Sequence, residues 1–173
     1  ASDGAVCRSP WERKGKERGG SQNEKAVLEE ADVICCTCVG AGDQRLNELK
    51  FPYILIDEAA QAMEPECMIP IVKGCKKLVL VGDHHQLAPV ILNGEARKAK
   101  LGRSLFERLL QAGHKSILLN HQYRMHPELA EFPSKQFYNS QYFNGVTAKD
   151  RPILKGKTFE WLSKTQPLMF INT

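Results

Sequence analysis

Three short polar runs carry side chains that suit phosphate chemistry. Asp57 and Glu58 follow an apolar run, where one carboxylate can hold Mg²⁺ through water and its neighbour can polarise an attacking water. Gln86 offers an amide to a terminal phosphate or to water. Arg124 is the residue type best suited to a phosphate in a dry cleft, and the adjacent Tyr123 can stack on a base. Each run alone also fits an ordinary loop.

The apolar pattern predicts strands and helices that position these runs. Short β-branched runs predict buried strands at 33–39, 53–56, 77–81, 117–119 and 168–171. Amphipathic spacing predicts helices at 24–31, 43–49, 65–72, 102–112 and 127–138. We expect Pro70 to kink or stop its helix, Pro133 to interrupt the last helix, and Ser104 to be an N-cap. The alternation predicts an α/β fold with a parallel sheet and helices on both faces. Ligands bind such sheets at the carboxyl ends of the strands, which is where the three polar runs fall.

The composition favours a reduced protein that does not span a membrane. The chain has 173 residues, 42% of them hydrophobic, and no apolar run approaches the ~20 residues of a bilayer span. Cys35, Cys36 and Cys38 fall in a predicted strand, so we interpret them as buried thiols rather than a metal or redox site. Residues 91–173 hold thirteen Lys and Arg against six Asp and Glu, a net +7. That excess can attract a polyanion, and a solvated basic face is the alternative.

The three polar runs stand in the motif order of the superfamily-one RNA and DNA helicases. They read Asp57-Glu-Ala-Ala-Gln61, Gly82-Asp-x-x-Gln-Leu-x-Pro89 and Gln122-Tyr-Arg-Met-His-Pro127. Further stretches resemble the up-frameshift RNA helicases of nonsense-mediated mRNA decay in particular: 31–43, 64–68, 104–109 and 144–148. The resemblance covers about residues 24–173.

The resemblance implies a RecA-like P-loop NTPase fold and a role for each motif residue. Asp57 would hold Mg²⁺ through water, with Glu58 beside it, and Glu58 would activate the hydrolytic water. Gln86 would sense the γ-phosphate of ATP. Tyr123 would pack against the adenine, and Arg124 would stabilise the transferring phosphoryl group as an arginine finger.

The resemblance also assigns a nucleic-acid path. Its residues would be Thr37, Val39, Gly40, Pro89 and Val90. Backbone amides and a hydroxyl suit phosphate contacts without base specificity. The implied ligand is single-stranded RNA, with DNA as the open alternative. The implied partners are mRNA decay factors, and the implied state is a monomer in the cytoplasm, with the nucleus as a second location.

The implied organisation has three parts. Residues 1–23 would be a divergent, disordered leader, 24–121 the carboxyl-terminal half of a first RecA-like domain, and 122–173 the start of a second. ATP would bind in the cleft between the two domains. Nothing in the chain fits Gly-x-x-x-x-Gly-Lys-Ser/Thr, the loop whose amides cradle phosphates. We therefore interpret the chain as an internal segment of an ATP-dependent RNA helicase that is inactive when isolated. The alternative is a non-catalytic RNA- or protein-binding module.

Overall fold

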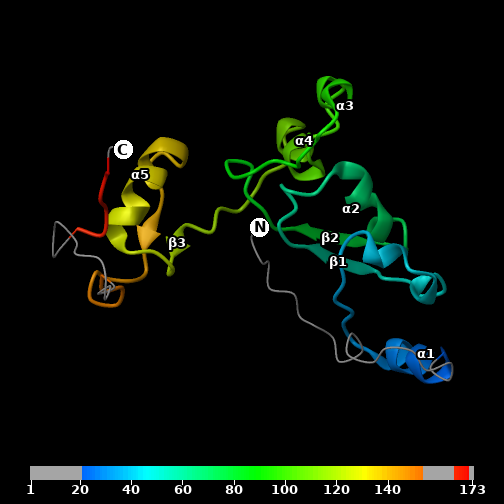
Figure 1. Ribbon diagram of the computed structural model, residues 1–173. Helices are drawn as coiled ribbons and strands as arrows, with labels where there is room; N and C mark the ends of the chain where they lie inside the picture. Colours follow the sequence, from blue (N-terminus) through cyan, green and yellow to red (C-terminus); the bar gives the residue numbers. More distant parts are fainter. Residues whose placement is uncertain (1–20, 154–165, 172–173) are drawn as a thin grey trace. The chain divides into compact units, whose positions relative to one another are not determined.

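The computed structural model describes residues 21–153 and 166–171. The chain divides into two compact units, residues 1–114 and residues 115–173, each of which is described by itself. The elements of both units are drawn in Figure 1. The predicted leader lies outside the described residues except for its last three positions, which open helix α1 (Ser21–Glu30). The predicted domain boundary before Gln122 stays a prediction.

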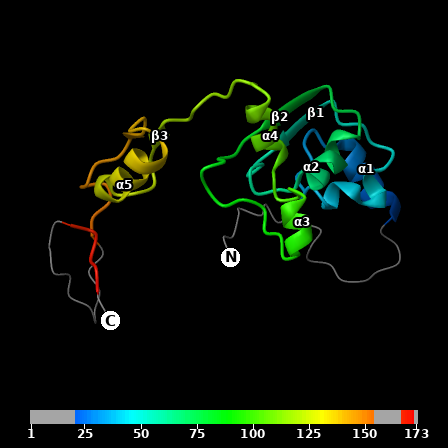
Figure 2. The ribbon, with the colours of Figure 1, turned by 90° about the horizontal axis from the view of Figure 1, so that it is seen from above.

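A parallel pair of strands forms the centre of the first unit. Strand β1 (Tyr53–Ile56) pairs with β2 (Lys77–Leu80), with Tyr53 opposite Lys77 and Ile56 opposite Leu80. Helix α2 (Glu64–Ile71) makes the crossover between them. Figure 2 shows the two strands side by side. Both strands lie where the sequence predicts them, and the α/β fold with a parallel sheet is confirmed.

One face of this sheet carries the hydrophobic core. Ile56, Cys67 of α2 and Leu105 of α4 (Leu105–Gln111) are buried together, with Ala59 completing the cluster. In Figure 1 both helices lie above the sheet. Strand side chains alternate between the two faces, so the even-numbered positions of β1 and β2 point into this core.

The other face of the sheet is open to solvent in the described part of the chain. Tyr53 is 72% exposed and Leu55 is 65% exposed, and Val79 and Val81 lie beside them on the same face. The prediction of strands buried on both faces is therefore wrong at these odd-numbered positions. A continuous apolar run indicates what a strand is able to bury, and the covering element has to come from elsewhere in the fold.

Three predicted strands are absent from the described residues. The stretches 33–39, 117–119 and 168–171 form no ladder, and Val33 is 78% exposed and Ile117 91% exposed. A strand needs a neighbour that pairs its N–H and C=O groups, and no described segment pairs with these three. Apolar composition alone does not supply that partner.

The cysteines of 33–39 also differ from the prediction. Cys35 and Cys36 are exposed and Cys38 is half-buried, so the interpretation as buried thiols is wrong for the first two. Among the described cysteines, the buried one is Cys67 in α2, which contacts Cys38. Burial raises the pKa of the Cys67 thiol to about 11, which keeps it protonated at neutral pH.

The helices follow their local start and stop signals. Ser104 caps α4 by accepting from Glu107 N at 3.1 Å, and Gly113 takes a left-handed φ of +90° just beyond the helix. Helix α2 runs through Pro70 to Ile71, and Val72 N still donates to Met68 O at 3.0 Å, so the early stop expected at Pro70 is wrong. The helix predicted at 43–49 is the short 3₁₀ turn η3 (Gln44–Leu46), preceded by η2 (Gly40–Gly42). Helix α3 (Gly94–Lys98) was not predicted.

The second unit is a small strand–helix–strand arrangement. Strand β3 (His121–Gln122) pairs in parallel with β4 (Phe143–Asn144), and α5 (Pro127–Phe137) lies between them in the sequence. Helix α5 runs through Pro133, so the predicted interruption is wrong; the helix only forgoes the one bond that proline is unable to donate. Among the described helices of both units, none is long and apolar enough to cross a membrane.

The two turns that follow β1 and β2 are packed against each other. Val81 N donates to Ile56 O at 2.9 Å, and Ala59 N donates to Val81 O at 2.8 Å. A Cβ built on Gly82 would stand 2.8 Å from Ala60 N and 3.1 Å from Ala59 N. The space beside Gly82 is thus taken by backbone of the first turn, and only glycine fits there.

We predict that Gly82→Ala destabilises the chain by about 1–3 kcal/mol, because the added methyl meets rigid backbone rather than a flexible side chain. Urea unfolding measures the loss. The control is Gly94→Ala, where a Cβ meets nothing within 4 Å. Equal stability of the two variants would contradict the close packing of the turns.

A bidentate ion pair joins α2 to α4. Arg108 donates to Glu64 through Nε at 2.8 Å and Nη2 at 2.6 Å. The hydrogen bonds from Arg108 hold the pKa of the Glu64 carboxyl below its ordinary value of 4.5. A lowered pKa in the folded state gives stability that is present above the ordinary pKa and is lost as pH falls through the lowered one.

We therefore predict that Arg108→Ala destabilises the chain at neutral pH and that the difference from the unaltered chain shrinks below about pH 4. Urea midpoints at about pH 7 and about pH 3 measure this difference. Lys98→Ala, which breaks the exposed pair with Glu95, serves as the control and should have little effect at either pH. A penalty for Arg108→Ala that is equal at both pH values would contradict the role of the Glu64 carboxylate.

Candidate functional site

The carboxylate pair predicted to serve Mg²⁺ and water lies at the carboxyl end of β1. Asp57 and Glu58 are both exposed, and Asp57 Oδ1 accepts from Glu58 N at 3.0 Å. Glu58 has a φ of 53°, a left-handed conformation that is uncommon outside glycine. Gln61 Nε2 donates to Glu58 Oε2 at 2.9 Å, so the turn returns on itself to hold this carboxylate.

These two carboxylates fit the predicted chemistry. In the described part of the chain Asp57 Oδ2 and Glu58 Oε1 accept no hydrogen bond, so each residue keeps one oxygen available. Carboxylate oxygen is the ligand type that Mg²⁺ prefers. Across residues 21–153 and 166–171 no group of three or more His, Cys, Asp or Glu side chains is placed to hold a metal ion. Nucleotide-bound Mg²⁺ generally takes its other ligands from water and phosphate.

Gln86 lies in the turn that follows β2. Its Nε2 donates to Asp83 Oδ2 at 2.9 Å, and Asp83 Oδ1 accepts from His85 N at 3.0 Å. Asp83 thus shapes the turn and anchors the amide nitrogen of Gln86, a role that the sequence did not reveal. Among the described residues, no hydrogen bond joins Gln86 to Asp57 or Glu58. What brings the two turns together is the backbone packing at Gly82.

The predicted nucleic-acid residues form two separate stretches of the first unit. Thr37, Val39 and Gly40 make a tight turn in which Gly40 N donates to Thr37 Oγ1 at 2.9 Å. That amide is occupied within the chain, whereas the hydroxyl hydrogen of Thr37 is still able to donate to a phosphate. Pro89 and Val90 lie in the irregular segment before α3, where Val90 is exposed.

A glutamine side chain organises the loop that holds the predicted adenine and phosphate residues. Gln122 Oε1 accepts from Arg124 N at 3.0 Å and from Met125 N at 2.8 Å. Gln122 Nε2 donates to Met125 O at 2.9 Å and to Asn144 Oδ1 at 2.6 Å. The loop between β3 and α5 is therefore fixed from within, while Tyr123 and Arg124 stay exposed.

Two residues that the sequence analysis gave no role also hold this loop. Arg151 Nε donates to Arg124 O at 2.9 Å, and Arg151 Nη2 donates to Tyr123 O. Gly145 lies against the ring of Tyr123. Gly145 stands in a stretch that carries the family resemblance, but neither it nor Arg151 has a neighbour in sequence that would indicate contact with Tyr123.

The structure thus gathers the predicted site residues in two sets. Asp57, Glu58 and Gln86 share one sheet edge of the first unit, and Tyr123 and Arg124 share one loop of the second. The two sets lie in different units, so their meeting in one ATP-binding cleft stays a prediction.

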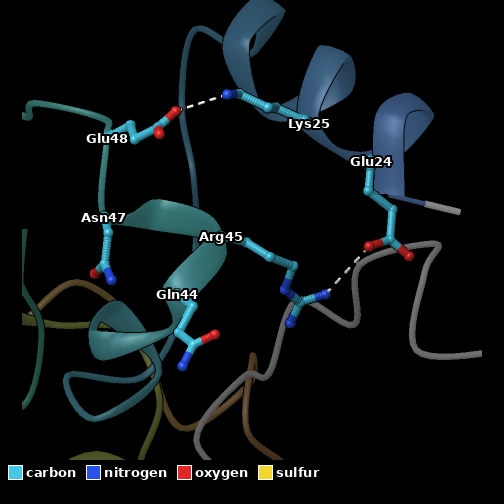
Figure 3. A pocket seen from close by; sticks show the side chains of 6 residues that line it. All are labelled: Glu24, Lys25, Gln44, Arg45, Asn47 and Glu48. Carbon is cyan, nitrogen blue, oxygen red and sulfur yellow. Dashed lines mark hydrogen bonds and ion pairs between the residues drawn. The ribbon is translucent and has the colours of Figure 1, made fainter.

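A pocket of the first unit lies between α1 and η3 and contains none of the predicted site residues. Its lining is entirely polar or charged: Glu24, Lys25, Gln44, Arg45, Asn47 and Glu48. Figure 3 shows Lys25 paired with Glu48, at 2.6 Å, and Arg45 facing Glu24, at 3.7 Å. These charges balance, so the pocket offers no net attraction to a phosphate.

Comparisons with known proteins agree with the motif order. Two family models described as AAA domain match the chain, one over residues 8–94 and the other over residues 101–173.

Relatives of known name are similar over most of the chain. A Regulator of nonsense transcripts 1 homolog of Neurospora crassa is 56% identical over 149 residues, which make up 86% of this chain and 14% of that protein. The ATP-dependent helicase upf1 of Schizosaccharomyces pombe is 55% identical over 85% of this chain and 16% of its own length. The ATP-dependent helicase NAM7 of Saccharomyces cerevisiae is 55% identical over 86% of this chain and 15% of its own length.

The chain therefore spans 16% or less of each of these relatives. The first family model covers half of the chain, the parallel strand pairs and helices of the described units are consistent with a partial RecA-like α/β domain, and the relatives share the motif region. The chain belongs to the AAA-domain family of P-loop NTPases, and the resemblance of its motifs to the up-frameshift helicases, the regulators of nonsense transcripts, is confirmed.

Proposed function

We propose that this chain works as part of an ATP-dependent helicase that moves on single-stranded RNA in nonsense-mediated mRNA decay. The observation that carries the proposal is the exposed Asp57–Glu58 pair at the carboxyl end of β1, held beside the Gln86 turn by the packing at Gly82. The names of the relatives, ATP-dependent helicase and Regulator of nonsense transcripts 1, support the same function.

In the first unit, the carboxylates of Asp57 and Glu58 have different roles in ATP hydrolysis. Glu58 uses Oε2 to accept from Gln61, which leaves Oε1 as the general base that takes a proton from the attacking water. Asp57 would hold Mg²⁺ through water, and Mg²⁺, when bound with ATP, supplies positive charge against the phosphate oxygens. Gln86, with its nitrogen anchored on Asp83, keeps its amide oxygen to orient water near the terminal phosphate.

In the second unit, Tyr123 and Arg124 serve the two ends of ATP. The Tyr123 ring is 62% exposed, so it has surface to pack on the adenine. The exposed Arg124 guanidinium would offset the negative charge that moves onto the transferring phosphoryl group.

The nucleic-acid part of the proposal rests on Thr37, Val39, Gly40, Pro89 and Val90 and on the net +7 of residues 91–173. RNA is favoured over DNA because the relatives are named for nonsense transcripts. As part of the same proposal, the protein is a monomer of the cytoplasm, with the nucleus as a second location, and mRNA decay factors are its partners.

The decisive experiment measures ATP hydrolysis by the full-length gene product without nucleic acid, with single-stranded RNA and with single-stranded DNA. We expect RNA to stimulate turnover most. Glu58→Gln keeps the acceptor for Gln61 but removes the general base, so it should retain ATP binding and lose at least about 10²-fold in kcat.

The control is Glu95→Gln on α3, an exposed glutamate outside the motifs, which should leave turnover unchanged. Normal turnover in Glu58→Gln would contradict the catalytic assignment. Stimulation by DNA alone would favour a DNA helicase, and a gene product that binds RNA but not ATP would favour the non-catalytic module.

Arg124→Ala tests the second unit. We expect about a 10³-fold loss of kcat with a small change in the Kd of ATP, because an arginine finger acts on the transition state. The matched control is Lys135→Ala on α5, which removes a cation that pairs with Glu131 in the described part of the chain. A raised Kd of ATP with an unchanged kcat would show instead that Arg124 binds ATP but does not stabilise the transition state.

A further inference from the structure

In the second unit, the Tyr123 ring lies directly on the backbone of Gly145. A Cβ built on Gly145 would stand 2.1 Å from Tyr123 Cε1 and 2.5 Å from Cδ1, whereas real Cβ contacts essentially never fall below 3.0 Å. Any side chain at position 145 would therefore move the ring or the loop. Gly145 itself is fixed, since its N–H donates to Gln122 O at 2.8 Å beside the β3–β4 pair.

The backbone that carries the ring is fixed by Arg151. One guanidinium donates to the carbonyl oxygens of both Tyr123 and Arg124. The residue before it, Asp150, is fixed in turn, because its carboxylate accepts from Thr147 N at 2.8 Å and Thr147 Oγ1 at 2.7 Å. Arg151 thus belongs to an ordered turn, and it reaches the loop from a sequence distance of 27–28 residues.

These contacts limit what the loop can do. Gly145 supports the Tyr123 ring, and the ring still keeps most of its surface open. The forked donation from Arg151 holds two consecutive carbonyls, which Lys, with its single ammonium group, does not match in geometry. Base stacking depends on where the ring lies, since any base offers a π-face.

We propose that Gly145 and Arg151 are positioning residues for ATP: Gly145 seats the Tyr123 ring that packs on the adenine, and Arg151 fixes the backbone from which Tyr123 and Arg124 extend. The inference rests on the proposed function, in which Tyr123 binds the adenine. Neither residue touches ATP, and each acts through the loop.

The test measures the Kd of ATP by calorimetric titration of the full-length gene product that carries Glu58→Gln, so that hydrolysis does not interfere. We expect Gly145→Ala and Tyr123→Ala each to raise the Kd roughly tenfold, the size expected for loss of one stacking contact. In the double variant, alanine at 123 leaves room for the new methyl. Its Kd should therefore equal that of Tyr123→Ala alone, including where Gly145→Ala by itself folds poorly.

The matched control is Gly94→Ala, where the added methyl meets nothing within 4 Å and the Kd should not change. If Gly145→Ala raises the Kd of ATP as much in the Tyr123→Ala protein as in the protein with Tyr123 intact, Gly145 does not act by seating the ring. The same conclusion follows if Gly145→Ala has a normal Kd while Tyr123→Ala has a raised one. A normal Kd for Tyr123→Ala would instead overturn the adenine role on which the inference rests.

Arg151 is tested by steady-state ATP hydrolysis in the protein with Glu58 intact. We expect Arg151→Ala to raise KM and lower kcat together, because it frees both Tyr123 and Arg124, and we expect Arg151→Lys to restore only part of either. Full rescue by Arg151→Lys would overturn the forked contact. A lower melting temperature with unchanged kcat and KM would show that Arg151 is merely structural and would overturn its positioning role.

Discussion

The parallel pairing of β1 with β2 is the constraint on which the first unit depends. Because the strands run in the same direction, the chain leaves both of them at the same edge, and the bond from Ala59 N to Val81 O ties one exit to the other. Gly82 then lets two backbones meet without an intervening side chain. The crossover helix α2 and helix α4 pack against the face of the sheet that carries the even-numbered strand positions. The predicted hydrolysis residues of this unit, Asp57, Glu58 and Gln86, all follow one of these two strands.

In both units, the predicted site residues lie in or beside turns that are stabilised by a polar side chain. A polar side chain at the start of a turn accepts N–H groups from the residues that follow it: Asp57 from Glu58, Asp83 from His85, and Gln122 from Arg124 and Met125. In each turn one oxygen of that side chain is thereby committed to structure, while Asp57 keeps Oδ2 available for the proposed Mg²⁺. The nearby Glu58 and Arg124 remain exposed, as their proposed roles in hydrolysis require. This division explains why polar residues stand next to one another in each motif.

Local signals in the sequence predict the elements that depend on local physics. The strands at 53–56 and 77–81 and the cap at Ser104 follow from a short apolar run and from a hydroxyl placed before a helix. The stretch 33–39 has an equally apolar pattern, yet it forms no strand in the described chain, because pairing depends on a partner that the pattern does not name. The same holds for the candidate site. The motif order predicts Glu58 and Arg124, but the contacts that Gly145 and Arg151 make with the Tyr123 loop depend on the folded arrangement of the second unit.

The exposed cysteines allow selective labelling of this chain with thiol-reactive dyes. Cys35 is open to solvent two residues before Thr37, while Cys67 is enclosed by the core and protonated, with a pKa of about 11. Among the described cysteines, a maleimide dye at neutral pH would therefore react far more readily at the adjacent exposed pair Cys35 and Cys36 than at Cys67. A fluorophore attached there would sit beside the turn of Thr37 and Gly40, so its emission would report on any polymer that settles on that turn, without a foreign residue having to be introduced.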